Sequence, residues 1–430
     1  MATEGRSHAH ARADDFRVGL DERSPVAHSH ARPMSANRTA RLFSVFVPAI
    51  VFAAVLVTST VYSIRHPFQN FDVLGYVAAA LHMEGLRGTE LLEGTRTELG
   101  EGIHEERKRA LMVTGQSPYH KALMSDPRAL EQQVPLYAPR VMYIGGIVAL
   151  HALGLSRVEA SSLISVLSVA ALAALGWWYV ARRFGAWTAT FVACAFGYGL
   201  RLDFLGELST ADALGALFAI VGSMAVLRAL EDKRALALGA ACLAFAVATR
   251  HDLLLHCALF VPVALWSTRG ARSLKDTAIA AAIVLVPSAI VYALLAVTTG
   301  WYGRETVIAF SFVEPQPYPL ETPLPDVWPF FWDTFFMELR EWREHPLIQR
   351  EVWPIYAAIL AWWFARPGAR ALLAVGVLEI VIRFCLFPVA GPGWQRLYMT
   401  TIVLTLWFAL EALLERARAT EHGRKLLSSA

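Results

Sequence analysis

Long apolar runs alternate with short polar connections along most of this chain, and several runs exceed the ~18 residues that cross a bilayer as a helix. Most charged residues lie in the connections between the runs. This pattern predicts an all-α fold, a polytopic transmembrane helical bundle of about ten spans with additional interfacial helices. The predicted spans lie at about 42–63, 158–181, 186–204, 210–230, 235–250, 252–267, 275–298, 352–365, 370–388 and 396–414.

Another apolar segment, at about 135–154, begins with two prolines and contains Arg140 and His151. Lys and Arg concentrate in cytoplasmic loops, so basic clusters decide how this segment is counted. If it does not cross, all the basic clusters lie on the side of both termini, which we predict to be cytoplasmic. Segment 135–154 then becomes an interfacial or re-entrant helix on the outer face. The clusters are Arg38/Arg41, Arg182/Arg183, Arg228/Lys233/Arg234, Arg269/Arg272/Lys275, Arg366/Arg370 and Arg416/Arg418/Arg424/Lys425.

Two long segments then lie outside. Segment 64–157 contains a mixed-charge stretch at 84–133, which predicts a solvated loop. Segment 299–351 is rich in Trp and Pro, and Trp prefers the water–lipid boundary, so we expect it to lie along the outer membrane surface with short interfacial helices. Residues 1–40 lack apolar periodicity and predict a disordered cytoplasmic tail, followed by one transmembrane domain at 41–430.

Composition supports an integral membrane protein. The 430 residues are 56% hydrophobic and 17% charged, with a mean hydropathy of +0.43, whereas soluble domains carry about 25% charged residues. The net charge of +3 is too small to indicate a nucleic-acid partner. This composition predicts that membrane lipids surround the protein and are its partners.

Polar residues gather at the predicted outer boundary from four separate parts of the chain. Charged groups beside spanning helices cost ~2.5–3.5 kcal/mol each by insertion scales, so several at one depth indicate a shared polar cavity. The residues are Asp72, Tyr76, His82, Glu84, Arg201, Asp203, Glu207, Asp212, Arg250, His251, Asp252, Gln395, Arg396 and Tyr398.

These segments resemble the glycosyltransferase-C superfamily, which includes the protein O-mannosyltransferases and the lipid A aminoarabinose transferases. "FDVLGYVAAALHMEG" is similar to the first outer loop of that family, with a lone Asp72 where many members have two adjacent acids. "LSTADALGALFAIVGSMAVLRAL" and "GWQRLYMTTIVLTLWFAL" resemble the acid that opens a span and the Arg-Tyr signature before the last span. The resemblance covers about 42–267 and 390–415.

The resemblance implies an enzyme that transfers a sugar from a polyprenyl-phosphate donor to a hydroxyl or amine of a lipid, glycan or protein acceptor. The reaction would invert the anomeric centre at the outer face of the cytoplasmic (inner) membrane. Asp72 is the expected general base, and partial desolvation is expected to raise its pKa. The alternative for Asp72 is the N-cap of an interfacial helix.

Arg396 and Arg250 are the expected ligands of the donor phosphate, because a guanidinium group matches phosphate oxygens. Interfacial anchoring is the alternative for Arg396, and a structural pair with Asp252 or Asp212 is the alternative for Arg250. Asp212 is expected to orient a sugar hydroxyl, ligate a metal, cap a helix or form a structural pair. Tyr76 is expected to contact substrate or to pack.

A divalent metal ion is the one cofactor considered. Glu84 and His251 carry donor atoms that such ions accept, but no ligand spacing in the sequence demands a metal.

Two other functions remain open. One is a transporter or flippase for a lipid-linked or anionic solute, which needs polar groups inside the membrane. Glu379 and Arg383, one helical turn apart in a predicted span, are such groups, although an intrahelical pair also explains them. The other is a noncatalytic relative that binds a lipid.

Overall fold

The computed structural model describes residues 34–104, 108, 118–270, 272–300, 302–313, 315–346, 349–389 and 394–420. These residues are helical without a β-strand, and a single isolated bridge joins Phe68 and Leu208. The prediction of an all-α fold is confirmed. The predicted tail lies outside the described residues for 1–33, whereas 34–40 belong to the first helix, which corrects the predicted boundary.

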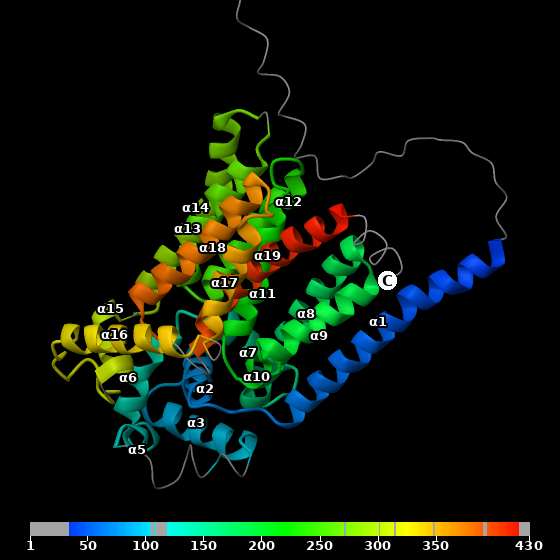
Figure 1. Cartoon of the computed structure of the whole chain (residues 1–430). Coiled ribbons are helices and arrows are strands. Elements are labelled where there is room, and N and C mark those ends of the chain that lie inside the picture. Colours follow the sequence, from blue (N-terminus) through cyan, green and yellow to red (C-terminus); the bar gives the residue numbers. More distant parts are fainter. Residues whose placement is uncertain are drawn as a thin grey trace, which may run out of the picture.

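The first half of the chain forms one long helix, a group of short helices and a helical hairpin (Figure 1). These are α1 (Met34–Arg65), α2 (Asp72–Met83), α3 (Gly88–Gly102), α5 (Pro118–Ser125), α6 (Pro127–Tyr137), α7 (Val141–Ala152), α8 (Arg157–Phe184), α9 (Ala186–Gly199) and α10 (Leu202–Glu207). A capping box between Ser156 and Glu159 starts α8, and Gly185, at φ 92°, ends it. The glycine accepts this left-handed backbone without a Cβ clash, so α9 folds back directly against α8.

The second half builds most of the bundle. Its helices are α11 (Asp212–Val226), α12 (Lys233–Thr249), α13 (Leu253–Thr268), α14 (Leu274–Thr298), α15 (Arg304–Ile308), α16 (Trp328–Glu344), α17 (Trp353–Trp362), α18 (Pro367–Leu386) and α19 (Met399–Ala419). A π-helical turn covers Ala309–Val313, and 3₁₀ turns cover Arg350–Val352 and Trp394–Tyr398. Gly222 and Gly239 let α11 and α12 approach closely, since a Cβ on either would crowd the other helix.

Among the described residues, four helices are long and apolar enough to cross a membrane: Phe43–Arg65 of α1, Arg157–Phe184 (α8), Leu274–Thr298 (α14) and the segment Arg396–Ala419, which contains α19. Each of the ten predicted spans contains a helix, but the full number of ten spans stays a prediction. Exposed apolar side chains form a stripe along α14, at Ile279, Ile283, Val286, Ile290, Leu294 and Val297. Such a stripe suits lipid rather than water, and we therefore treat the chain as a membrane protein.

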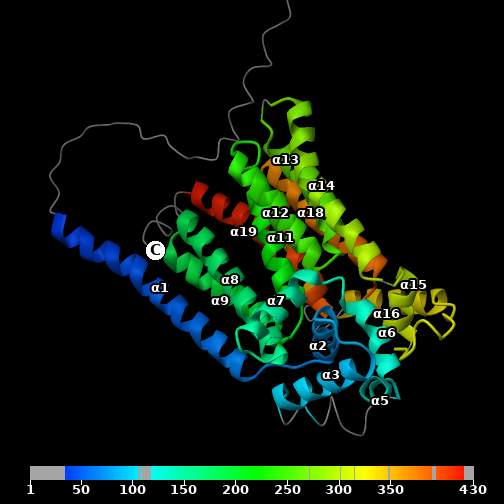
Figure 2. The same cartoon turned by 180° about the vertical axis from the view of Figure 1, so that it is seen from behind.

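Helix α7 has 12 residues, which at 1.5 Å per residue is about 18 Å, too short for a hydrocarbon core of ~30 Å. The interfacial or re-entrant position of this segment stays a prediction. Figure 2 shows α2, α3, α5, α6 and α16 at one end of the molecule, while α1 diverges from the bundle along one side.

The predicted solvated loop at 84–133 is wrong. Helices α3, α5 and α6 fall in this stretch, and they pack with α2 and α7 around their own apolar core. Leu91, Leu99, Leu123 and Leu130 are fully buried there. Glu90, Glu93, Arg96 and Glu101 lie between or beyond the leucines of α3 and are exposed.

Segment 299–351 forms the predicted short helices α15 and α16, and its connecting loop packs against α6. Tyr302 donates a hydrogen bond to the Gln132 carbonyl at 2.8 Å, and Gln133 donates to the Gln316 carbonyl at 3.0 Å. Most large apolar side chains of α16 are exposed, as in Trp332 and Phe336. A helix with one face this apolar suits an interfacial position.

Candidate functional site

The starts of helices α2 and α11 and one 3₁₀ turn meet where the short helices of the first half of the chain join the bundle. Asp72 is the first residue of α2, Asp212 is the first residue of α11, and Arg396 lies in the 3₁₀ turn that leads into α19. Both aspartates sit at a helix N-terminus, where the helix dipole favours a negative charge. The buried face of α2, including Val73 and Val77, fixes the direction of Asp72.

Asp72 forms an ion pair with Arg396, whose Nη1 lies 2.9 Å from Asp72 Oδ2. Asn70 Nδ2 donates to the same oxygen at 2.7 Å. Among the residues that the structure describes, Oδ1 accepts only a long hydrogen bond from Tyr137, at 3.5 Å. The side chain of Asp72 is 27% exposed. Phe71 is the N-cap of α2 and no side chain caps the helix, so the capping alternative for Asp72 is not what the structure shows.

The expected upward shift of the Asp72 pKa is wrong. Burial does raise the pKa of this carboxyl, but the charge and hydrogen bond of Arg396, the charge of Arg140 and the hydrogen bond from Asn70 together outweigh burial. The pKa of Asp72 therefore lies below its ordinary value. The sequence argument counted desolvation alone, because the position of Arg396 beside Asp72 depends on tertiary structure.

Asp212 and Arg250 form the second ion pair of the site, with side chains only 9% and 11% exposed. Arg250 also holds Asp252 in a bidentate pair, with Nε and Nη2 at 3.0 and 2.9 Å from its two oxygens. Arg396 Nε lies 3.6 Å from Asp212 Oδ2, so this pair adjoins the first. The structural pairing considered for Arg250 and Asp212 is confirmed.

The charged contacts continue into the helical bundle. Arg383 Nη1 lies 2.6 Å from Asp252 Oδ2, and Arg383 Nε lies 2.9 Å from Glu379 Oε1, which confirms the intrahelical pair predicted in α18. Glu379 Oε2 lies 2.8 Å from His256 Nδ1, and His256 Nε2 lies 2.8 Å from Ser223 Oγ.

We call these eight charged or ionisable residues the ionic network; they are Asp72, Arg396, Asp212, Arg250, Asp252, Arg383, Glu379 and His256. The sequence analysis missed the inner part of this network. His256 lies four residues after Asp252, on the same face of α13, and this spacing was the only available signal.

Tyr76 is buried and packs edge-on against Tyr137 and Tyr143, with ring centroids 5.2 and 4.8 Å away. Burial raises the pKa of Tyr76 to about 12, so its hydroxyl stays neutral. Arg140 lies over the rings of Tyr76 and Tyr137 at 5.6 and 5.5 Å. The packing alternative for Tyr76 is what the structure shows, and Arg140 is an additional cation of the site that sequence patterns did not single out.

Glu84 does not join this cluster. It lies at the opposite end of α2 from Asp72, where Arg157 donates to it at 2.5 Å and also pairs with Glu98. His251 precedes Asp252, which is held by two arginines. Within the described parts of the chain, no three His, Cys, Asp or Glu side chains are grouped as metal ligands.

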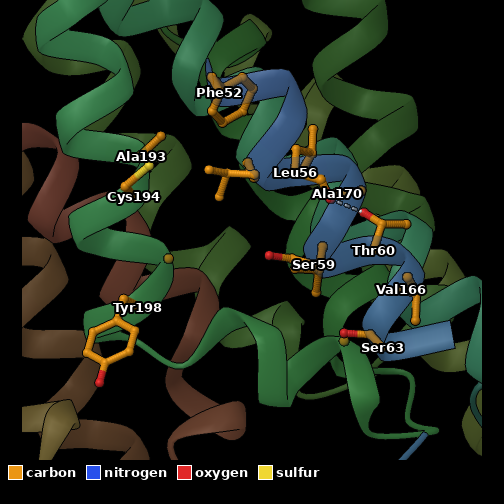
Figure 3. Close-up of a pocket in the computed structure, with 15 residues that line it drawn as sticks. Phe52, Leu56, Ser59, Thr60, Ser63, Val166, Ala170, Ala193, Cys194 and Tyr198 are labelled. Atoms are coloured by element: carbon orange, nitrogen blue, oxygen red, sulfur yellow. Dashed lines mark hydrogen bonds between the residues drawn. The ribbon is translucent and has the colours of Figure 1, made fainter. Parts of the chain in front are cut away.

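An apolar groove of about 400 Å³ lies between α1, α8 and α9 (Figure 3). Phe52 and Leu56 of α1 face Ala193 and Cys194 of α9 across it. Ser59, Thr60 and Ser63 add hydroxyl groups along α1 toward the end that leads to α2. The groove has the dimensions and polarity of a site for an alkyl or isoprenoid chain.

Comparison with protein-family models, curated proteins and solved structures finds no match to this chain. The site's chemistry is therefore argued from its geometry. A lightly bonded carboxylate oxygen lies beside a guanidinium group, with two further arginines near it, at the edge of a helical bundle. This arrangement can accept a proton from one substrate and bind an anionic group of another.

Proposed function

We propose that this chain is an integral-membrane glycosyltransferase of the glycosyltransferase-C type. It transfers a sugar from a polyprenyl-phosphate donor to a hydroxyl or amine of a lipid, glycan or protein acceptor. The observation that carries the proposal is the pair of Asp72 and Arg396, which places a proton acceptor next to an anion-binding group. The resemblance of the sequence around both residues to that superfamily supplies the reaction type.

Asp72 is the general base. The acceptor O–H or N–H approaches Oδ1, whose hydrogen bond within the described part of the chain is the 3.5 Å one from Tyr137, while Oδ2 stays bonded to Asn70. The acceptor attacks the anomeric carbon, the bond from that carbon to the phosphate oxygen breaks, and the acceptor proton passes to Asp72. Attack opposite the leaving phosphate inverts the anomeric centre.

Arg396 binds the donor phosphate. Its guanidinium group touches the carboxylates of Asp72 and Asp212, so a phosphate at this position takes over contacts that the two acids make in its absence. Arg250 stays fixed between Asp212 and Asp252 and adds positive charge behind Arg396. Asp212 then lies where it can accept a hydrogen bond from a sugar hydroxyl.

The isoprenoid part of the donor has a place in the apolar groove between α1, α8 and α9. In the proposed topology the ten predicted spans cross the cytoplasmic (inner) membrane, both termini are cytoplasmic and the site lies on the outer face.

Transport of a lipid-linked or anionic solute is a second candidate, and the depth of the ionic network favours it. Ser223 lies on the same helix as Asp212, 11 residues further along α11, which is about 16 Å at 1.5 Å per residue. Ionisable groups buried at such depth in a membrane bundle often mark an ion or proton path. A noncatalytic lipid-binding relative would need neither the Asp72–Arg396 pair nor a buried ionic network.

Reconstitution in liposomes separates these functions. The full-length protein is supplied with a polyprenyl-phosphate sugar, and lipid extracts and acceptors are analysed by mass spectrometry, in parallel with extracts from cells with and without the gene. New glycosylated product that depends on Asp72 supports the transferase. Movement of intact donor across the bilayer without product supports the transporter and overturns the proposal.

Sidedness is tested with a cysteine at Glu101, an exposed residue near the end of α3. The background carries Cys385→Ala, which removes an exposed native thiol. Labelling by a membrane-impermeant maleimide in intact cells is expected. Labelling only after lysis contradicts an outer site.

A further inference from the structure

A second cavity, of about 540 Å³, lies between α8, α11, α13, α18 and α19. Five arginines and two glutamates line it, an excess of three positive charges: Arg182, Arg183, Arg228, Arg366, Arg418, Glu411 and Glu415. The lining residues of α8, α11 and α13 come from the C-terminal ends of these helices, and those of α18 come from its N-terminal end.

This arginine cavity lies at the far end of the bundle from the candidate site. Asp212 begins α11, whereas Arg228 lies two residues after its last residue, Val226. Arg396 and Arg418 lie near opposite ends of the segment that contains α19. With 21 residues, α19 extends about 30 Å, which is the thickness of a bilayer hydrocarbon core. The cavity therefore faces the opposite membrane boundary.

Two of the five arginines are already paired. Arg183 contacts Glu411, which also accepts a hydrogen bond from Tyr179 at 3.1 Å, and Arg366 lies 3.6 Å from Glu415. Among the described residues, the other three make no ion pair with a carboxylate. Arg182 lies over Trp178 and Arg418 lies over Phe184, at 4.7 and 4.8 Å. Positive charge thus remains available around an open volume.

The rest of the wall is apolar and includes Met224, Leu227, Leu372 and Phe408. An inorganic anion would use the arginines but would leave these side chains without a partner. A phospholipid supplies both parts, a phosphate for the guanidinium groups and an acyl chain for the apolar wall. Basic pockets between transmembrane helices on the cytoplasmic side are known to bind lipid head groups in this way.

We propose that this cavity binds an anionic phospholipid, with its phosphate among Arg182, Arg228 and Arg418 and an acyl chain against Leu227 and Phe408. Binding does not depend on the proposed glycosyl transfer. Only the leaflet, which is the cytoplasmic one, follows from the proposed topology. The competing explanation is that the arginines merely fix the topology and complement helix C-termini, a role that requires no ligand.

The test uses the full-length protein in a neutral detergent, titrated with phosphatidylglycerol and read by native mass spectrometry. The double variant Arg228→Gln/Arg418→Gln should weaken phosphatidylglycerol binding by at least about 10-fold, since each arginine near a lipid surface contributes appreciably. The matched control is Arg234→Gln/Arg272→Gln, which removes two exposed charges of the same predicted side that do not line the cavity. Binding by the control should equal that of the unchanged protein.

A third variant tests the cavity itself without changing any charge. Ala369→Phe keeps every charge but fills part of the cavity, and it should weaken binding as well. Equal binding by all variants, or equal loss in the control, would overturn the proposal. Phosphatidylcholine binding as tightly as phosphatidylglycerol would also overturn it. Full displacement of the lipid by millimolar inorganic phosphate would indicate a free-anion site and would likewise reject a phospholipid.

Discussion

Asp72 Oδ2 and Arg396 Nη1 lie 2.9 Å apart, so an acid that follows the first long helix contacts an arginine that precedes the last one. The same arginine approaches Asp212 at 3.6 Å. In the proposed reaction, a donor phosphate that binds Arg396 competes with the contact to Asp72. The carboxylate then keeps its burial but loses its main counter-charge, which raises its pKa and makes it a better base when the donor is present.

Asp72→Asn should reduce sugar transfer by about 100-fold or more, because a general base typically contributes 10²–10⁴-fold. The amide keeps the size of the side chain and accepts from Arg396, so folding should be retained. The measurement is the initial rate with saturating donor in liposomes. The control is Asp276→Asn, at the start of α14 away from the site. Full turnover by Asp72→Asn would remove this residue from the base role.

Arg396→Gln should move the acidic limb of the pH profile of kcat/KM upward, because a neighbouring positive charge lowers the pKa of a carboxyl and the variant removes that charge. The base form of Asp72 exists above its pKa, and the pKa is depressed by Arg396. In the unchanged protein Arg396 is paired with Asp72 until donor binds, so the acidic limb of kcat/KM, which reports the free enzyme, lies below the ordinary aspartate range. In the variant the charge and hydrogen bond of Arg396 are gone while burial, Arg140 and Asn70 remain, so activity is lost at a higher pH than in the unchanged protein. Profiles that superimpose, with Arg272→Gln as control, would contradict the assigned contact.

Glu379→Ala should lower the thermal unfolding temperature strongly. Glu379 is 1% exposed between His256 and Arg383, and removal of one partner of a buried pair costs ~3–5 kcal/mol. The control is Glu344→Ala, whose carboxylate is 45% exposed in a surface pair with Arg343, where ~0–1 kcal/mol is expected. Scanning fluorimetry in detergent gives both values. A Glu379→Ala protein as stable as its control would show that the inner network carries no stability.

Gly75→Ala should destabilise the apolar core that α2, α3, α5, α6 and α7 share. A Cβ at Gly75 would overlap the ring of Tyr137, whereas a Cβ at Gly145 of α7 meets nothing within 4 Å. Overpacking of this kind costs roughly 1–3 kcal/mol, while Gly145→Ala should stabilise its helix by about 0.5–1 kcal/mol. The two unfolding temperatures should therefore move in opposite directions. Equal shifts would show that the Tyr137 ring moves aside without loss of stability.

Hydrophobic patterning located each helical segment of the bundle, because the apolar runs are long and their flanking arginines are local signals. Patterning also placed Asp72, Asp212, Arg250 and Arg396 at one level, and the structure brings the four together. It failed for 84–133, where helical leucines are interspersed with charges. It also missed Asn70 and Tyr137, since neither carries a charge or a motif.

The inner part of the ionic network, formed by Arg383, Glu379 and His256, also could not be predicted from sequence patterns, apart from the Glu379–Arg383 pair within α18. His256 sits in a span that otherwise reads as apolar, and its partners Ser223 and Glu379 come from α11 and α18. No local pattern connects three helices that are distant in sequence. The direction of the Asp72 pKa failed for the same reason, because the decisive charge lies 324 positions further along the chain.

Acids and arginines alternate along the ionic network from Asp72 through Arg396, Asp212, Arg250 and Asp252 to Arg383 and Glu379. Neutralising one member strands the opposite charges on both sides of it. Natural sequence variation at these positions should therefore occur as compensated pairs, with an altered acid accompanied by an altered arginine next to it. Single substitutions should therefore be rarest at the buried inner members, such as Glu379 and Arg383, and most frequent along the exposed aliphatic stripe of α14.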